Sequence, residues 1–191
     1  MIELKLRHTA LRVDFSFVAV LAVFFWLDRS GFGFVTLGLC AAHELAHLVV
    51  MLAYGIIPES ITFYGAGIRI SAPEVDVRSV PVRTAVYSAG CIMNFLLAGL
   101  FLCGGYGTAS AVSLLTGCFN LLPVGEFDGL RLLSMAVISG ARPEHVDSIL
   151  FWSGLASAML MSGVLIFFGR EVSPTLVITS AYIILMALRR V

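Results

Sequence analysis

Charged residues are scarce in this sequence, and their signs cancel. Only 13% of the 191 residues are Asp, Glu, Lys or Arg, and with 12 of each sign the formal net charge at pH 7 is zero. Nucleic-acid binding needs concentrated positive charge, so the composition argues against that class of protein. Hydrophobic residues make up 59% of the chain, which is typical of integral membrane proteins rather than soluble domains.

Cysteine is also too sparse and too scattered to organise the fold. All four cysteines lie in apolar runs and none forms a CxxC pair: Cys40, Cys91, Cys103 and Cys118. We therefore expect small core residues, with neither a disulfide framework nor a thiolate zinc site. A cleavable signal peptide is not expected, because Leu27-Asp28-Arg29 after the first apolar run lacks the small residues that cleavage requires.

Long apolar runs are what the sequence has instead. They predict an all-α polytopic fold with about six membrane-spanning helices, near residues 13–27, 31–54, 82–103, 108–122, 146–168 and 173–188. No repeat or linker divides them, so we expect one membrane domain over residues 1–191. Residues 1–12 carry three cationic side chains and are expected to form a basic arm at the membrane surface. Residues 130–139 indicate a short amphipathic stretch.

The segment at residues 60–71 interrupts the helical pattern. Apolar and polar residues alternate on both sides of Gly65-Ala66-Gly67, which predicts a short β-hairpin between the second and third spans. We expect one edge of this hairpin, at Ile68 and Ile70, to hold an extended substrate segment by main-chain hydrogen bonds. The alternative is a re-entrant loop that only plugs a cavity.

The distribution of cationic residues predicts the orientation in the membrane. With six spans both termini lie on one side, and that side holds ten of the 12 Lys and Arg residues, whereas the other holds only Arg29 and Arg170. Such an excess marks the cytoplasmic side. We therefore expect an integral protein of a bacterial cell membrane with both termini in the cytoplasm.

The most informative stretch is His43-Glu44-Leu45-Ala46-His47, in the middle of the second span. Residues four apart share a helix face, so the imidazoles of His43 and His47 can bind one metal ion. Glu44 lies about 100° around the helix, from where it can act as general base on a metal-activated water. Ionisable groups at bilayer depth cost roughly 2.5–3.5 kcal/mol each, so three within five residues indicate a functional site rather than packing.

Zinc needs a third protein ligand, and spacing alone leaves two alternatives. Glu126 and Asp128 follow the fourth span, on a stretch that Pro123 excludes from a helix, so we expect irregular backbone there. His8 lies on the predicted arm and His145 at a helix start, where a solvated role is favoured. The second and fourth spans both run toward the cytoplasm. This direction brings the two histidines and the two acidic residues to the same leaflet.

Together the two motifs closely resemble the site-2 protease family of intramembrane zinc metalloproteases. HELAH on a membrane helix is followed two helices later by Asn120-Leu121-Leu122-Pro123-Val124-Gly125-Glu126-Phe127-Asp128-Gly129. This second motif matches the family pattern N-x-x-P-x-x-x-x-D-G residue for residue. The resemblance covers about residues 31–130, the core catalytic region, and implies that Asp128 is the third ligand to Zn²⁺.

Two positions depart from the family pattern. Gly90 and Asn94 are similar to the family's G-P-x-x-N element on the intervening helix, but Cys91 replaces the proline. We therefore expect a structural role for Asn94. Leu130 stands where many members have a second glycine after D-G.

The resemblance implies a zinc endopeptidase that cleaves a membrane-associated protein within the bilayer. Glu44 is expected to take a proton from the attacking water and pass it to the leaving amine. Asn120 is the donor that we expect at the oxyanion, and its alternative role is to cap the broken end of the fourth helix. The compact chain is most similar to the bacterial sporulation-type branch, which suggests regulated proteolysis of a sigma-factor precursor or an anti-sigma factor.

The competing function is a non-catalytic zinc-binding membrane protein, either a carrier or a pseudoprotease. A carrier would place ligands along a path between both leaflets, whereas these motifs lie toward one, and Glu44 is present. Both points favour the protease. The expected partners are a membrane-associated protein substrate and the lipid bilayer, with room for a regulatory membrane partner.

Overall fold

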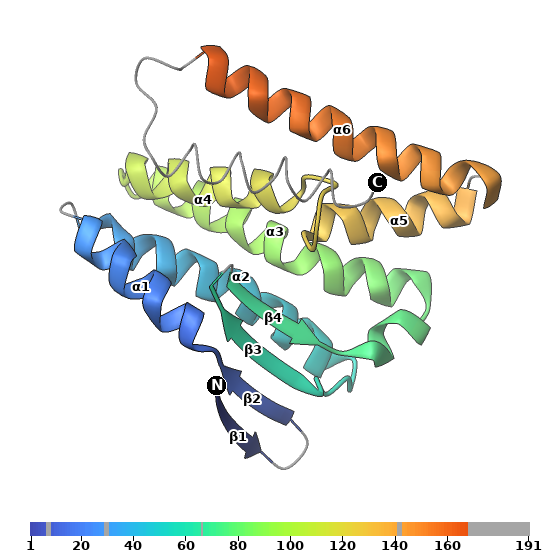
Figure 1. Ribbon diagram of the computed structural model, residues 1–191, viewed down its shortest axis with the longest axis horizontal. Coiled ribbons are helices and arrows are strands. Elements are labelled where there is room, and N and C mark those ends of the chain that lie inside the picture. Colours follow the sequence, from blue (N-terminus) through green and yellow to red (C-terminus); the bar gives the residue numbers. More distant parts are fainter. Residues whose placement is uncertain (7–8, 29–30, 66, 141–142, 168–191) are drawn as a thin grey trace. The chain divides into compact units, whose positions relative to one another are not determined.

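The computed structural model describes residues 1–6, 9–28, 31–65, 67–140 and 143–167 (Figure 1). The chain divides into two compact units, the first ending at Gly117 and the second beginning at Cys118. The span predicted at residues 173–188 lies outside the described residues.

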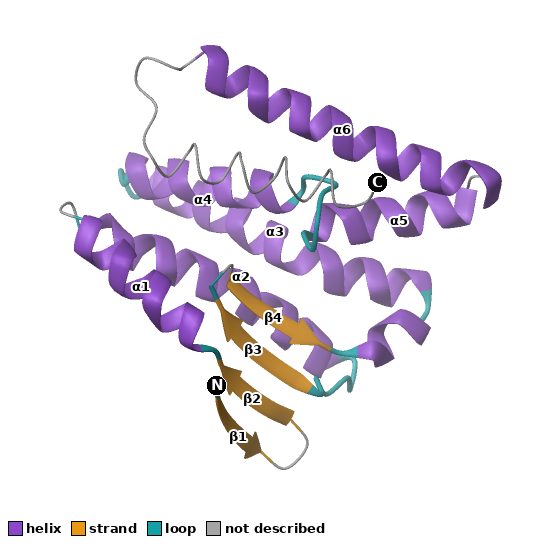
Figure 2. Ribbon diagram, in the orientation of Figure 1, coloured by secondary structure: helices purple, strands orange, loops and turns teal. Residues whose placement is uncertain are grey.

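The first unit contains a four-stranded sheet, only half of which was predicted (Figure 2). Its strands, in spatial order, are β1 (Ile2–Leu6), β2 (Thr9–Val13), β3 (Ser60–Tyr64) and β4 (Gly67–Ser71). The β2–β3 pair is parallel and the other two pairs are antiparallel. The hairpin predicted at residues 60–71 is confirmed as β3 and β4. The fold is therefore mostly helical with a small sheet, rather than all-α.

The basic arm predicted at residues 1–12 is wrong, because this segment forms β1 and β2. Apolar and charged residues alternate along β1, which is typical of a strand. The prediction of a basic arm rested on the number of charges and did not use this alternation. The register places Leu4 opposite Leu11, and Leu11 opposite Ile61. On the charged face, Arg12 of β2 forms an ion pair with Glu3 of β1 at 3.4 Å. Apolar pairs and ion pairs between neighbouring strands both stabilise a sheet, so the charged residues of this segment contribute to the fold.

Two helices lead from β2 to β3. The first, α1 (Phe15–Leu27), begins at Asp14, whose carboxylate accepts a hydrogen bond from the Ser16 N–H. The second, α2 (Phe32–Ala53), ends in a Schellman motif in which Gly55 has a φ of 71° and the Ile56 N–H donates to the Met51 carbonyl over 2.9 Å. Ile56 is fully buried, which completes the apolar contact of the motif. The predicted end of this span near residue 54 is thereby confirmed.

The long helix α3 (Val80–Cys103) packs along α2. It follows a 3-10 turn, η1 (Pro73–Val77), and α4 (Gly107–Asn120) comes next. Two serines of α4 tie it to α3: Ser113 donates to the Asn94 carbonyl over 2.8 Å and Ser110 to the Ala98 carbonyl over 2.7 Å. Each hydroxyl donates its proton to a main-chain carbonyl of α3. The two helices can therefore approach closely without burying an unpaired polar group.

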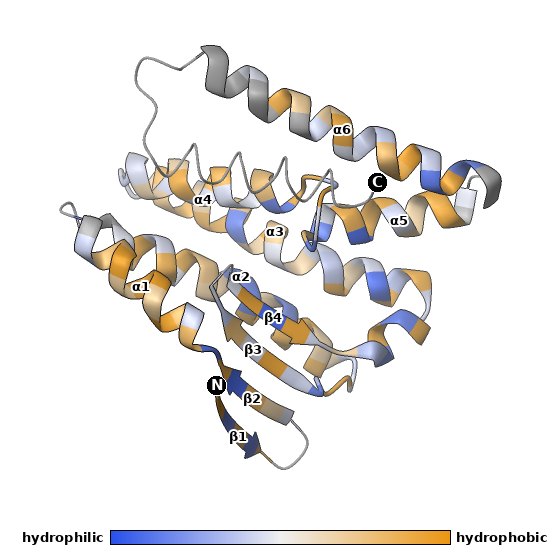
Figure 3. Cartoon of the chain, viewed as in Figure 1, coloured by the Kyte–Doolittle hydropathy of each residue, from blue (hydrophilic) through white to orange (hydrophobic). Residues whose placement is uncertain are grey.

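Two of the described helices are long and apolar enough to cross a membrane: Gly33–Ala53 and Val80–Cys103. With 21 and 24 residues they would extend about 32 and 36 Å, against a hydrocarbon core of about 30 Å. Each exposes an apolar stripe, made of Leu45, Val49 and Leu52 on α2 and of Ile92, Leu96 and Leu100 on α3. Figure 3 shows α1 as hydrophobic along nearly its whole length. Such surfaces suit a lipid environment, and the full number of spans stays a proposal.

The second unit contains α5 (Asp128–Gly140) and α6 (Pro143–Phe167), which pack on each other. The loop at residues 121–127 is compact, since the Val124 N–H donates to the Leu122 carbonyl and the Val124 side chain is buried. Irregular backbone is thus confirmed for Glu126 but wrong for Asp128, which is the first residue of α5. A carboxylate there interacts favourably with the positive end of the helix dipole. The amphipathic stretch predicted at residues 130–139 is confirmed by α5.

Candidate metal centre

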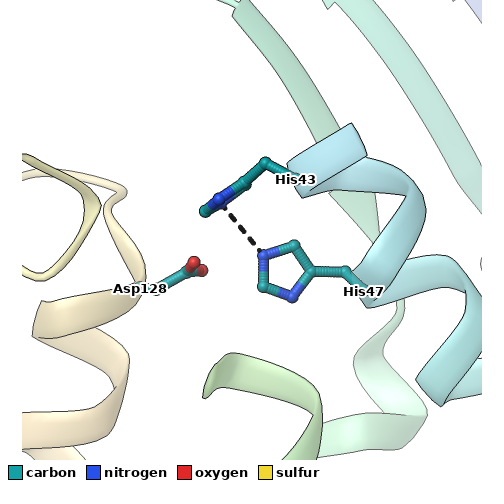
Figure 4. Close-up of side chains that lie close together, drawn as sticks. All are labelled: His43, His47 and Asp128. Carbon is teal, nitrogen blue, oxygen red and sulfur yellow. Dashed lines mark hydrogen bonds between the residues drawn. The ribbon is translucent and has the colours of Figure 1, made fainter. Parts of the chain in front are cut away.

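Two imidazoles converge halfway along α2. His43 is the twelfth of the 22 residues of the helix, and the side chains of His43 and His47 are 3% and 6% exposed. Their Nε2 atoms lie 3.2 Å apart, as the dashed line in Figure 4 marks. Two nitrogen ligands at about 2.0–2.1 Å from a tetrahedral zinc ion lie about 3.3 Å from each other. The spacing of the two nitrogens therefore fits joint ligation.

The close approach of α3 leaves no room for a side chain beside these nitrogens. A methyl group placed on Gly90 would lie 2.4 Å from Nε2 of His47 and 2.5 Å from Nε2 of His43. A carbon atom cannot occupy that position unless both rings move. Gly90 thus keeps the space open into which both ring nitrogens point.

The other ring nitrogen of each histidine meets a group on α3. Nδ1 of His47 donates to the main-chain carbonyl of Val86 over 2.7 Å, and this fixes the tautomer whose Nε2 carries a lone pair. Nδ1 of His43 lies 3.1 Å from the side-chain amide of Asn94, which is fully buried. Such contacts orient histidine rings for a metal ion.

Glu44 is half-buried, whereas the two histidines beside it are buried. A general base has to exchange protons with water, so partial exposure suits the predicted role better than full burial would. Its place in the sequence, directly after His43, puts it next to the ligand pair without making it part of that pair.

The loop that precedes α5 is closed by a backbone contact within the second unit. A methyl group on Gly129 would lie 1.9 Å from the carbonyl oxygen of Leu121, so the two backbones touch. Asn120 and Asp128 each directly precede one of the touching residues and are therefore held near each other. Asp128 is half-buried, whereas Glu126 is exposed.

Figure 4 draws His43 and His47 of the first unit together with Asp128 of the second. Among the residues that the structure describes, these are the one set of three or more side chains that could supply ligands to a metal ion. Two imidazole nitrogens and a carboxylate oxygen are a donor set that fits Zn²⁺.

Comparison with known proteins agrees with this donor set. The fold matches that of the site-2 protease from Methanocaldococcus jannaschii with a TM-score of 0.66, at 21% identity, over 99% of this chain and 94% of that chain. A Mycobacterium tuberculosis protein named "Putative zinc metalloprotease Rip3" is 30% identical over 152 residues, or 72% of this chain, in both strains compared. The chain spans 37% of the length of these relatives. No family model matches. The chain thus shares the fold of that site-2 protease and is similar in sequence to a protein named as a zinc metalloprotease.

The remaining residues that the sequence predicts for the site lie on described elements, with one exception. Ile68 and Ile70 are half-buried in β4, which is an edge strand of the sheet. Asn120 is the last residue of α4, and His145 is exposed near the start of α6. His8 lies outside the described residues.

Sequence reasoning missed two contributors to this centre. The Val86 carbonyl is a main-chain group, so no side-chain pattern points to it. Gly90 was noticed as part of a family element, but its close contact with both imidazoles was not foreseen. A glycine on the next helix is the signal that could have raised the question, because glycine is otherwise unfavourable in a helix interior.

Proposed function

We propose that the chain is an intramembrane zinc endopeptidase that cleaves membrane-associated proteins. The observation that carries the proposal is the convergence of two buried imidazoles, with a glutamate beside them, halfway along an apolar helix of membrane length. Ionisable groups at that depth are costly and are kept where they serve a function. The relationship to a protein named as a zinc metalloprotease supports the same reading.

His43, His47 and Asp128 are the zinc ligands in this proposal. Asp128 is supported over Glu126 by its partial burial and by its place in the family motif. Three protein ligands leave one position open, as catalytic zinc sites do and closed structural sites do not. This point favours a protease over a protein that only stores zinc.

Bound zinc would supply Lewis acidity that makes water a nucleophile near neutral pH. Glu44 would take the proton that the water gives up as it attacks the peptide carbonyl, and would then deliver it to the leaving amine. Asn120 would donate a hydrogen bond to the oxyanion, and its closeness to Asp128 within the loop supports this role. The alternative, an amide that caps the end of α4, is compatible with its position as the last residue of that helix.

The substrate would bind as an extended strand along the outer edge of β4. The Glu59 N–H donates to the Ser71 carbonyl over 2.8 Å, so the main chain of Ser71 faces β3. Main-chain direction alternates along a strand, so the N–H and C=O groups of Ile70 and Ile68 face away from β3. An unwound substrate segment could pair with those groups whatever its side chains are.

The finer parts of the proposal concern location and substrate. We place the protein in a bacterial cell membrane with about six spans and cytoplasmic termini, on the distribution of its cationic residues. A sigma-factor precursor or an anti-sigma factor is the specific substrate hypothesis, and a regulatory membrane partner would fit such proteolysis. A non-catalytic zinc protein remains the alternative that the following experiment separates.

Replacing Glu44 by Gln tests the proposal. Because Glu44 is the base and not a ligand, cleavage of single-pass membrane substrates by the purified protein should fall by about 10²–10⁴-fold, with zinc content unchanged. Glu126→Gln, which removes an exposed carboxylate from the loop, is the matched control and should cleave normally. Wild-type cleavage by zinc-loaded Glu44→Gln would defeat the mechanism. A wild-type protein that holds zinc but cleaves no substrate would favour the non-catalytic alternative.

A further inference from the structure

Asn94 is buried completely, yet one end of its amide has no partner. Its side-chain nitrogen lies 3.1 Å from Nδ1 of His43, and its side-chain oxygen accepts no hydrogen bond from the residues that the structure describes. The two ends of an amide have nearly the same shape, and a half-turn of the group exchanges them. The surroundings of Asn94 therefore permit either end to face His43.

Zinc ligation removes that freedom. A histidine that binds a metal through Nε2 carries its proton on Nδ1, so Nδ1 becomes a donor and its neighbour has to be an acceptor. The amide nitrogen cannot accept a hydrogen bond, whereas the amide oxygen can. With zinc bound, the oxygen of Asn94 must therefore face Nδ1 of His43.

The two histidines differ in this respect. Nδ1 of His47 meets the Val86 carbonyl, which can only accept, so its tautomer is fixed with or without metal. Nδ1 of His43 meets an amide that can accept or donate. When the amide nitrogen faces Nδ1, the proton of His43 sits on Nε2 and points at Nε2 of His47, 3.2 Å away. That arrangement closes the hydrogen-bond chain but leaves His43 without a lone pair for a metal ion.

We infer that Asn94 is a positioning residue for zinc: its amide oxygen accepts the Nδ1 proton of His43 and so holds the Nε2 lone pair toward the ion. The inference rests on the proposed role of the two histidines as zinc ligands. It replaces the purely structural role expected from the sequence.

The packing of α4 on α3 holds Asn94 in place. The Asn94 carbonyl accepts a hydrogen bond from the Ser113 hydroxyl, and a methyl group on Gly117 would lie 3.2 Å from the Asn94 Cβ atom. Small residues on α4 thus bring its backbone against the base of the side chain. The amide group can still rotate by half a turn about the last torsion of the side chain. The side chain cannot move away from His43.

Zinc affinity of Asn94 variants, measured by competition with a chromophoric chelator, tests the inference. Asn94→Leu keeps the shape but removes the acceptor, and should weaken zinc binding by about 10–100-fold, the usual effect of losing such a partner. Asn94→Asp keeps an acceptor and cannot donate, so its affinity should equal or exceed that of the wild type. Wild-type affinity in Asn94→Leu, or equal losses in both variants, would overturn the inference.

Nitrogen-15 NMR of histidine-labelled protein gives a readout that needs no Asn94 variant to fold. With His8 and His145 replaced by Gln, only the two site histidines report. In the zinc-loaded protein both should carry protonated Nδ1 atoms that exchange slowly with water. Fast exchange of the Nδ1 proton of His43 would overturn the inference, because that ring would then lack its buried acceptor.

The same measurements separate failure of the inference from failure of the proposed function. If His47→Ala binds zinc as tightly as the wild type, the proposed ligands are wrong. If zinc-loaded His43 carries its proton on Nε2, the role of Asn94 is wrong, because the metal then binds the nitrogen that faces the amide. If His47→Ala loses zinc while Asn94→Leu keeps wild-type affinity, only the role of Asn94 is wrong. In folded Asn94→Asp the Nδ1 proton of His43 should also move downfield, because a carboxylate is the stronger acceptor.

Discussion

The two halves proposed to form the metal centre belong to different units and are built by different means. In the half on α2 and α3, side chains determine the available space. The two imidazole rings fit there because Gly90 has no side chain. The half at the start of α5 is limited by backbone, because Gly129 touches the Leu121 carbonyl. A buried ring can turn aside if it gives up its hydrogen bond, whereas a backbone contact can yield only if the loop itself moves. The same substitution should therefore have different consequences in the two halves.

Gly129→Ala should have the largest effect. Its methyl group would overlap the Leu121 backbone, so the loop must rearrange, with a loss of about 1–3 kcal/mol of stability and displacement of Asp128. Thermal unfolding in detergent should show a lower midpoint, together with loss of zinc and of cleavage. Gly140→Ala, at the end of the same helix with nothing within 4 Å, is the control and should behave as the wild type. A Gly129→Ala protein of normal stability would contradict the backbone contact.

Gly90→Ala should remove zinc while leaving the fold intact. The methyl group would displace both imidazoles, which can turn away without moving α2, so the unfolding midpoint should change little. Zinc affinity should fall by more than about 100-fold, beyond the usual effect of losing an outer contact. Gly99→Ala on the same helix meets nothing within 4 Å and should bind zinc normally. If Gly90→Ala destabilises the protein as much as Gly129→Ala does, the proposed difference between the two halves is incorrect.

Asp128→Asn and Glu126→Gln compare two acidic residues of the second half. Removing the charge of Asp128 should lower bound zinc by roughly 10–100-fold, since an amide is a weaker ligand than a carboxylate. The exposed Glu126 should be replaceable without loss of metal. Metal analysis of both proteins that gives the reverse order would assign the ligand to Glu126.

Ile70→Pro should have the smallest effect on the metal centre and a selective effect on cleavage. Proline removes an N–H that faces the outer edge of β4, so substrate pairing should weaken while zinc content stays normal. Ile70→Val keeps that donor and should cleave nearly as well as the wild type, and the same comparison applies at Ile68. Full cleavage by the proline variants would favour the alternative in which the hairpin only plugs a cavity.

The sequence predicted the first half of the centre better than the second. Helical periodicity alone places His43 and His47 on one face, because the spacing of four is a local property of the helix. Asp128 depends on how a loop folds back, which no local pattern describes, and it was predicted by family resemblance. The two strands at the N-terminus were missed because their charges were interpreted as a surface arm, and the pairing of β2 with β3 was missed because it spans a long separation in sequence. The orientation of the Asn94 amide depends on the contact between two helices and is equally absent from any single segment.

The parallel pairing of β2 and β3 has a consequence for the bilayer itself. β2 leads directly into α1, and α2 leads back to β3, so the two helices attach to opposite ends of a parallel pair of strands. α1 has 13 residues and extends only about 20 Å, which is less than the hydrocarbon core of about 30 Å. A helix this short that crosses a bilayer draws the two lipid leaflets together around it. The membrane around α1 should thus be thinner than elsewhere, with a shorter path for water toward bilayer depth.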